Sequence, residues 1–151
     1  MVECFICAKH ADLTVVPGGA IMGDGHVLVT HLPLQTPAGA ADRVYLGYLF
    51  VEPRRHVAEL GDLSSEEAAS VGRFVSAASR ALQLGVGAEH VYAAVIGDAV
   101  DHLHLHLIAR YPATPRQYWW TRVDEWPDAP RGGADAIAAL AERLRGLTAP
   151  E

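Results

Sequence analysis

Residues 102–108 read HLHLHLI, so three histidines alternate with three leucines. Successive side chains of a β-strand point to opposite faces, whereas a helix repeats every 3.6 residues. The alternation therefore predicts a strand, which at a rise of about 3.3 Å per residue carries His102, His104 and His106 about 6.6 Å apart on one face. The leucine face is predicted to pack against a core, which leaves the histidine face free for chemistry.

A strand that only covers a core also alternates, so the histidines must be weighed against chance. The chain has 8 histidines in 151 residues, and shuffled sequences of this composition place three at alternate positions in about 2% of cases. Adjacent imidazoles also repel one another when protonated, and sheet stability alone favours Thr, Val or Tyr. We therefore interpret the three histidines as functional.

The composition is that of one globular domain spanning residues 1–151, since 50% of the residues are hydrophobic and 20% are charged. A formal net charge of -6 argues against a surface that tracks a nucleic-acid polymer. The longest apolar run, residues 44–51, is too short to span a bilayer, and the amino terminus lacks the basic and apolar regions of a secretory signal. We therefore expect a cytoplasmic protein without a membrane partner.

The first third of the chain is predicted to be mainly β-structure. Residues 15–21 and 27–29 are typical of a hairpin around the Gly-Asp-Gly turn at 23–25. Residues 33–42 predict a loop, and residues 44–51 predict one strand or two short ones.

One long helix is the clearest element of the remaining chain. Ser64 and Glu67 have capping-box spacing, apolar residues then recur at helical intervals, and Gly85 predicts the helix end. Residues 90–96 predict the strand that pairs with the histidine strand across a turn at 97–101.

The carboxy-terminal part is predicted to be irregular over residues 111–133, which are rich in proline and aromatic side chains, and then to form a short helix that stops near Gly146. The whole pattern predicts an α+β fold. Its antiparallel sheet has about five strands, packed with one long helix and a short carboxy-terminal helix.

Cys4 and Cys7 are the only cysteines, and in a reducing compartment their Cys-x-x-Cys spacing favours a metal site or a redox pair over a disulfide. Two thiolates on one Zn²⁺ need two further nitrogen or sulfur ligands, and a closed site of this kind is structural. Two ordinary thiols are the alternative. Histidines that can complete such a site are His10, His26, His56 and His102.

The histidine strand resembles the His-φ-His-φ-His-φ-φ signature of the histidine triad (HIT) proteins, where φ is apolar. Residues 47–56, GYLFVEPRRH, look like the strand and Pro-Lys-x-His corner of that family, and the long helix follows at family-like spacing. The resemblance covers about residues 4–112.

What the resemblance implies is a nucleotide-binding hydrolase or nucleotidyl transferase, usually homodimeric, that acts at a nucleoside α-phosphate. It implies that His104 is the nucleophile, that a nucleotidyl-histidine forms and that His106 serves the phosphate. It leaves His10 and His26 as surface histidines. Zinc-containing members of the family bind the metal at positions that match Cys4, Cys7, His56 and His102 of this chain, so the resemblance implies a structural Zn²⁺ on these four residues.

The chain departs from the family pattern where substrate is held. The family usually carries Gly-Gln-Ser or Gly-Gln-Thr shortly before the triad, whereas this chain has Gly97, Asp98 and Ala99. An amide donor and a hydroxyl donor are lost, and a carboxylate is gained near the expected phosphate. The resemblance still implies that these residues meet the nucleotide and that Thr30 stands where a ribose contact is expected. Residues 34–44 look like an insertion that can replace the lost contacts.

Three interpretations remain open. The first is a HIT enzyme acting through His104, and the second is a nucleotide-binding protein on the same fold with little or no catalysis. The third is an unrelated zinc hydrolase in which the three triad histidines themselves hold the metal. The aromatic segment is open as well: Trp119, Trp120 and Trp126 can stack on a base, line a pocket, or pack in a core or dimer contact.

Overall fold

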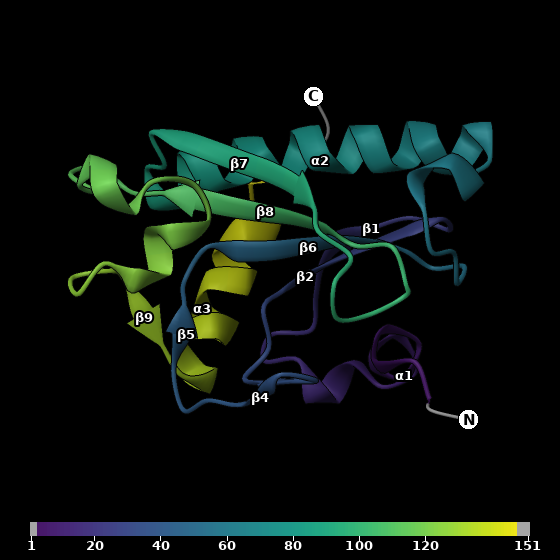
Figure 1. Cartoon of the computed structure of the whole chain (residues 1–151), viewed down its shortest axis with the longest axis horizontal. Helices are drawn as coiled ribbons and strands as arrows, with labels where there is room; N and C mark the ends of the chain where they lie inside the picture. Colours follow the sequence, from purple (N-terminus) through teal and green to yellow (C-terminus); the bar gives the residue numbers. More distant parts are fainter. Residues whose placement is uncertain (1–2, 148–151) are drawn as a thin grey trace.

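The computed structural model describes residues 3–147 and has an α+β fold built on a five-stranded antiparallel sheet, as predicted (Figure 1). The strands lie in the order β1-β2-β6-β8-β7, and every neighbouring pair is antiparallel. Their bounds are β1 Ala20–Gly23, β2 Val27–His31, β6 Tyr48–Pro53, β7 His90–Val95 and β8 Leu105–Arg110.

Two helices cover one face of this sheet, α2 (Ser65–Val86) and α3 (Ala134–Arg145) (Figure 1). The side chains that meet them include Leu49 of β6 and Leu107 of β8, both fully buried in the main core. Because side chains alternate along a strand, the neighbours of these leucines point to the other face of the sheet. Phe50 and His106, directly opposite one another in the β6–β8 pair, therefore lie on the face away from the helices.

The predicted histidine strand is shorter than expected, because β8 begins only at Leu105. The β6–β8 register pairs Val51 with Leu105 and would bring Leu103 opposite Pro53. Proline has no N–H to donate to a sheet ladder. Leu103 instead donates its N–H to the carbonyl of Val57, so residues 102–104 leave the sheet. The prediction of three imidazoles at regular spacing on one strand face is therefore wrong.

Helix α2 begins as the sequence predicts, with a reciprocal capping box between Ser64 and Glu67. It ends two residues later than predicted, at Gly87, whose left-handed φ of 69° suits glycine. Gly85 lies inside the helix, where a Cβ would come 2.7 Å from Leu144 of α3. This glycine permits close packing of the two helices, which is why it does not end α2.

The other differences from the predicted elements are local. The amino-terminal helix α1 (Phe5–Ala11) was not predicted, and Val15, expected to start the first strand, ends a 3-10 turn, η1 (Leu13–Val15), so that β1 begins only at Ala20. The predicted loop contains a small hairpin, and the aromatic segment contains two 3-10 helices and a short strand. These further elements are β3 Gln35–Thr36, β4 Gly39–Ala40, β5 Val44–Tyr45, η2 Leu60–Asp62, η3 Arg116–Tyr118, η4 Trp120–Glu125 and β9 Arg131–Gly132, with β9 paired to β5.

Within residues 3–147, none of the helices combines the length and the apolar character that crossing a bilayer requires.

A buried histidine ties β2 to the turn before β6. His31 is fully buried, its Nδ1–H donates to the carbonyl of Leu32, and its Nε2 accepts the N–H of Gly47. Gly47 has a φ of 88°, so its tight turn needs both glycine and this acceptor. Burial lowers the pKa of His31 from 6.5 to about 4, which means that the folded protein holds this imidazole neutral.

The buried His31 should make the fold sensitive to acid. Because the unfolded chain takes up this proton near pH 6.5 and the folded chain only near pH 4, stability is complete above pH 6.5 and falls as the pH drops towards 4, by about 3 kcal/mol. Denaturant unfolding at pH 7 and pH 4 should show that the wild type loses this much more stability than His31→Gln, which does not titrate. His26→Gln, on the exposed turn after β1, is the matched control. Equal losses in the wild type and His31→Gln would contradict the assignment.

Candidate active site and metal centre

Four side chains from three distant segments converge at one end of the sheet. They are Cys4, Cys7, His56 and His102, whose ligand atoms all lie within 4.8 Å of one another. Cys7 Sγ lies 3.4 Å from His56 Nδ1, and both sulfurs lie 3.5 Å from His102 Nδ1. Tetrahedral bonds of zinc length separate ligand atoms by about 3.3–3.8 Å. The donors and their spacing therefore fit one tetrahedral metal ion.

His102 is prepared for this role by its surroundings. It is fully buried, and its Nε2–H donates to the carbonyl of Pro53 at 2.7 Å. The tautomer with Nε2 protonated leaves the lone pair on Nδ1, the atom that faces the cysteines. Burial also lowers the pKa of His102, which favours the neutral, ligating form. Cys4 caps helix α1 and its sulfur accepts the N–H of Cys7, so the cluster anchors α1 to the sheet.

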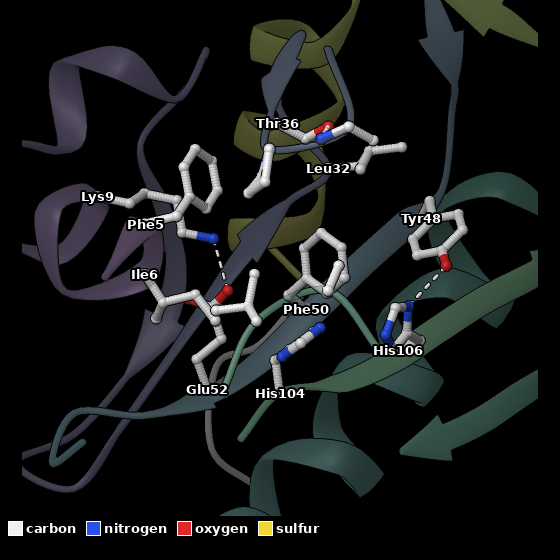
Figure 2. Close-up of a pocket in the computed structure, with 14 residues that line it drawn as sticks. Phe5, Ile6, Lys9, Leu32, Thr36, Tyr48, Phe50, Glu52, His104 and His106 are labelled. Atoms are coloured by element: carbon white, nitrogen blue, oxygen red, sulfur yellow. Dashed lines mark hydrogen bonds and ion pairs between the residues drawn. The ribbon is translucent and has the colours of Figure 1, made fainter. Parts of the chain in front are cut away.

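His104 takes its orientation from the same residue. Its Nδ1 lies 2.7 Å from the carbonyl oxygen of His102. A carbonyl only accepts, so Nδ1 must carry the proton and Nε2 must hold the lone pair. The ring lines a mostly apolar cavity on this face of the sheet (Figure 2). In the tautomer that this hydrogen bond selects, the Nε2 lone pair of His104 is free to act as a nucleophile.

His106 lies beside His104, with ring centroids 4.9 Å apart, but has different partners. Its Nδ1 lies 2.6 Å from the hydroxyl of Tyr48, while its Nε2 is buried and has no hydrogen-bond partner among residues 3–147. Burial, followed by the nearby His104, lowers the pKa of His106 to about 4. The imidazole is therefore neutral near pH 7 and offers one unpaired nitrogen to a ligand.

The cavity in front of these two rings has a volume of about 220 Å³ and mostly apolar walls. The polar groups that line it include the two imidazoles and the Tyr48 hydroxyl (Figure 2). The β3–β4 hairpin, part of the apparent insertion, contributes Thr36, Pro37 and Ala38. The other lining residues are Phe5, Ile6, Lys9, Leu32, Phe50, Glu52, Ala99 and Val100.

A buried ion pair that the sequence did not predict forms one wall. Lys9 of α1 and Glu52 of β6 are each 1% exposed, and Lys9 Nζ lies 2.5 Å from Glu52 Oε1 (Figure 2). His10 completes the group by bonding to Glu52 Oε2 at 2.7 Å. These contacts lower the pKa of Glu52 despite its burial. His10 is therefore not a surface histidine as expected, whereas His26 is exposed.

Of the remaining residues predicted to contact the nucleotide, Gly97 and Ala99 line a cavity and Asp98 and Thr30 do not. Ala99 lines the main cavity, and Gly97 lines a smaller one of about 100 Å³ that also touches His104. Asp98 is exposed and lines neither of these two cavities. Thr30 is fully buried and approaches the site only through its hydroxyl, which lies 3.3 Å from Lys9 Nζ.

The three tryptophans lie over the far end of β7 and β8, and none lines the main cavity. The Arg110 guanidinium stacks 3.8 Å above the ring of Trp119. Trp120 contacts the ring of Tyr92, and Trp126 packs on a small core around Tyr45. Trp119 and Trp126 therefore pack within the chain, whereas Trp120 is 46% exposed and can still make contacts outside it.

Comparisons with known proteins agree with this geometry. Residues 38–113, just over half of the chain, match the HIT domain family. Comparison with functionally curated proteins gives no significant match. The family match begins after Cys4 and Cys7, so it bears on the triad and the corner histidine but not on the cysteine pair.

Solved structures of HIT proteins share the fold. A hypothetical histidine triad nucleotide-binding protein from Sulfolobus tokodaii gives a TM-score of 0.70 at 18% identity, covering 96% of this chain and 91% of its own. A zinc-bound histidine triad family protein from Mycobacterium smegmatis gives 0.65 at 20% identity, covering 97% and 93%. The NitFhit protein of C. elegans gives 0.60 at 20% identity, covering 85% of this chain and 27% of its own. With the family match and the triad geometry, these structures lead to one conclusion: the chain belongs to the histidine triad (HIT) family.

Proposed function

We propose that this protein is a nucleotide hydrolase or nucleotidyl transferase that acts at a nucleoside α-phosphate through His104. The observation that carries the proposal is the hydrogen bond from His104 Nδ1 to the His102 carbonyl, because it leaves the Nε2 lone pair free at a cavity. Nε2 attacks phosphorus in line, the Nε2–P bond forms, and the bond to the leaving group breaks. Water or a second acceptor then takes the nucleotide and restores the imidazole.

The charges around the cavity favour a substrate whose leaving group adds little negative charge. Lys9 is the only cation among the lining residues, and Glu52 neutralises it. Arg54 donates to the carbonyl of Asp24, and Arg55 pairs with Glu67. Hydrogen-bond donors must then hold the reacting phosphate. His106 Nε2, in the ring beside His104, is an unpaired group that can take this role.

For the rest of the nucleotide, we propose that the backbone at Gly97, Asp98 and Ala99 borders the phosphate and that Thr30 supports the pocket through Lys9. The apolar wall suits a base or an apolar leaving group. The acidic Asp98, which lies in the chain between the cavity-lining Gly97 and Ala99, also favours a second candidate, a nucleotide-binding protein on the same fold with weak catalysis.

The metal in the four-ligand cluster is proposed to be Zn²⁺ with a structural role, since two thiolates and two imidazoles close its coordination shell. Thiolate ligands must stay reduced, which supports a cytoplasmic location. The third interpretation, a metal held by the whole triad, loses its support because His102 is the one triad histidine whose ring joins this cluster, through Nδ1 beside the two cysteines.

A homodimer is proposed through the outer strand β7. This strand has a partner on one side only, so its other edge carries unpaired backbone groups. Val95 and Ile96, at the end of the strand, are 40% and 43% exposed. A second copy that adds to this edge would cover both the backbone groups and these apolar side chains.

Replacing the thiolates should remove the metal and loosen the amino terminus. Cys4→Ser with Cys7→Ser is expected to purify without zinc and to lose several kcal/mol of stability, because metal binding and folding are coupled. Metal analysis and thermal unfolding test this, with exposed His26→Ala as the control that keeps one equivalent of zinc. Full zinc occupancy in the double variant would instead support a metal held by the triad.

Removing the proposed nucleophile should abolish the covalent intermediate. The wild type, incubated with adenylated and guanylated phosphoramidates, phosphoesters and phosphoanhydrides, is expected to form a nucleotide adduct that intact mass spectrometry detects. His104→Ala should lack the adduct and lose about four orders of magnitude in kcat. Nucleotide binding without an adduct or turnover in the wild type would favour the binding protein.

Charging the β7 edge should separate the dimer. Val95→Lys with Ile96→Lys places two like charges from each copy at the shared edge, so light scattering should report a monomer where the wild type is a dimer. Leu84→Lys, at an exposed position on α2, is the matched control and should remain dimeric. A dimer that survives the double substitution would exclude this edge as the interface.

A further inference from the structure

Tyr48 is a polar residue of the site that the sequence patterns did not single out. It begins β6, lines the cavity and places its hydroxyl 2.6 Å from His106 Nδ1 (Figure 2). This is the hydroxyl's one hydrogen bond among the interactions described for residues 3–147. The His106 ring is also held by Phe50, whose centroid lies 5.0 Å away in an edge-to-face contact. Within the protein, the hydrogen bond to His106 therefore connects the Tyr48 hydroxyl to the reaction centre.

Counting donors decides the direction of this hydrogen bond. If Nδ1–H donates to Tyr48, the phenolic proton has no acceptor within the protein and the buried His106 Nε2 lone pair is also unpaired, which leaves two groups without a partner. If Tyr48 donates to Nδ1, only an Nε2–H is left unpaired. Burial raises the pKa of Tyr48 to about 12, so the hydroxyl keeps its proton. The second arrangement costs less because unsatisfied buried groups are expensive.

We infer that Tyr48 is a positioning residue that locks His106 in the tautomer protonated at Nε2, so that its N–H points at the phosphoryl group. This inference rests on the proposed function of the site. His104 and His106 then hold opposite tautomers: the carbonyl of His102 takes the Nδ1 proton of the first, while Tyr48 donates to Nδ1 of the second. One ring presents a lone pair and its neighbour presents a donor.

The opposite tautomers divide the work at phosphorus. His104 Nε2 supplies the electron pair that forms the bond to phosphorus. His106 Nε2–H donates a hydrogen bond to a phosphoryl oxygen, whose negative charge grows in the transition state. A lone pair at that position would repel the same oxygen. The tautomer of His106 thus decides whether it helps or hinders the reaction.

Imidazole ¹⁵N NMR at pH 7 tests the assignment directly on the metal-loaded protein. The wild type should show His106 protonated at Nε2, with His106→Gln identifying its signals. Tyr48→Phe removes the donor and keeps the ring, so a substantial share of His106 should move to the Nδ1-protonated form. Tyr111→Phe is the matched control, because it loses a buried hydroxyl that donates to the Leu46 carbonyl away from His106. Protonation at Nδ1 in the wild type overturns the inference.

Kinetics provide the second readout. Tyr48→Phe should lower kcat about ten- to hundredfold with little change in KM, because the lost interaction matters mainly in the transition state. In a His106→Gln background the side chain has no tautomers, so adding Tyr48→Phe should change kcat less than twofold. An equal effect of Tyr48→Phe in both backgrounds would show a structural role and overturn the inference.

The two proposals fail in distinguishable ways. If no nucleotide is turned over by the wild type, the proposed enzymatic function fails, while the NMR result still decides the tautomer. If turnover is normal and Tyr48→Phe leaves both the tautomer and kcat unchanged, the role of Tyr48 is rejected and the function stands.

Discussion

The buried side chain of His102 is the contact on which the site depends. Its Nε2–H bonds to the end of β6, its Nδ1 faces the two cysteines, and its carbonyl fixes the ring of His104. One residue therefore joins the sheet, the four-ligand cluster and the proposed nucleophile. Because the ring is neutral and fully enclosed, a shift of this residue would disturb all three at once.

The two faces of the sheet have different roles: one packs against the helices, and the other carries the residues of the candidate site. Leu107 packs among the helices on one face, and His106 lies beside Phe50 on the other. The ladder ends where Pro53 cannot donate, which frees residues 102–104 to turn towards the four-ligand cluster and the cavity. A regular strand would have aimed all three imidazoles the same way. The break gives His102 a structural role beside the two histidines that line the cavity.

Local patterns predicted most of the fold, and long-range pairings explain what they missed. The capping box at Ser64 and the alternation over residues 102–108 depend on neighbours in sequence, so the helix start and a strand in this segment were both predicted. Helix α1 is seven residues long and is held by the cysteine cluster, which a helix pattern does not reveal. The roles of Lys9 and Tyr48 depend on partners about forty and sixty residues away. No local sequence pattern predicts that these residues come into contact.

The Lys9–Glu52 ion pair contributes to the shape of the cavity wall but adds little net charge to the cavity. Each group is buried, so removing either one would strand the other at a cost of about 3–5 kcal/mol. Nζ lies 5.3 Å from the centroid of Phe50, the ring that also packs against His104 and His106. A cation already neutralised by its carboxylate has little field left for a phosphate. The phosphate of the proposed substrate would therefore depend on oriented N–H groups for its stabilisation. The role of the ion pair itself is to hold α1 and β6 together.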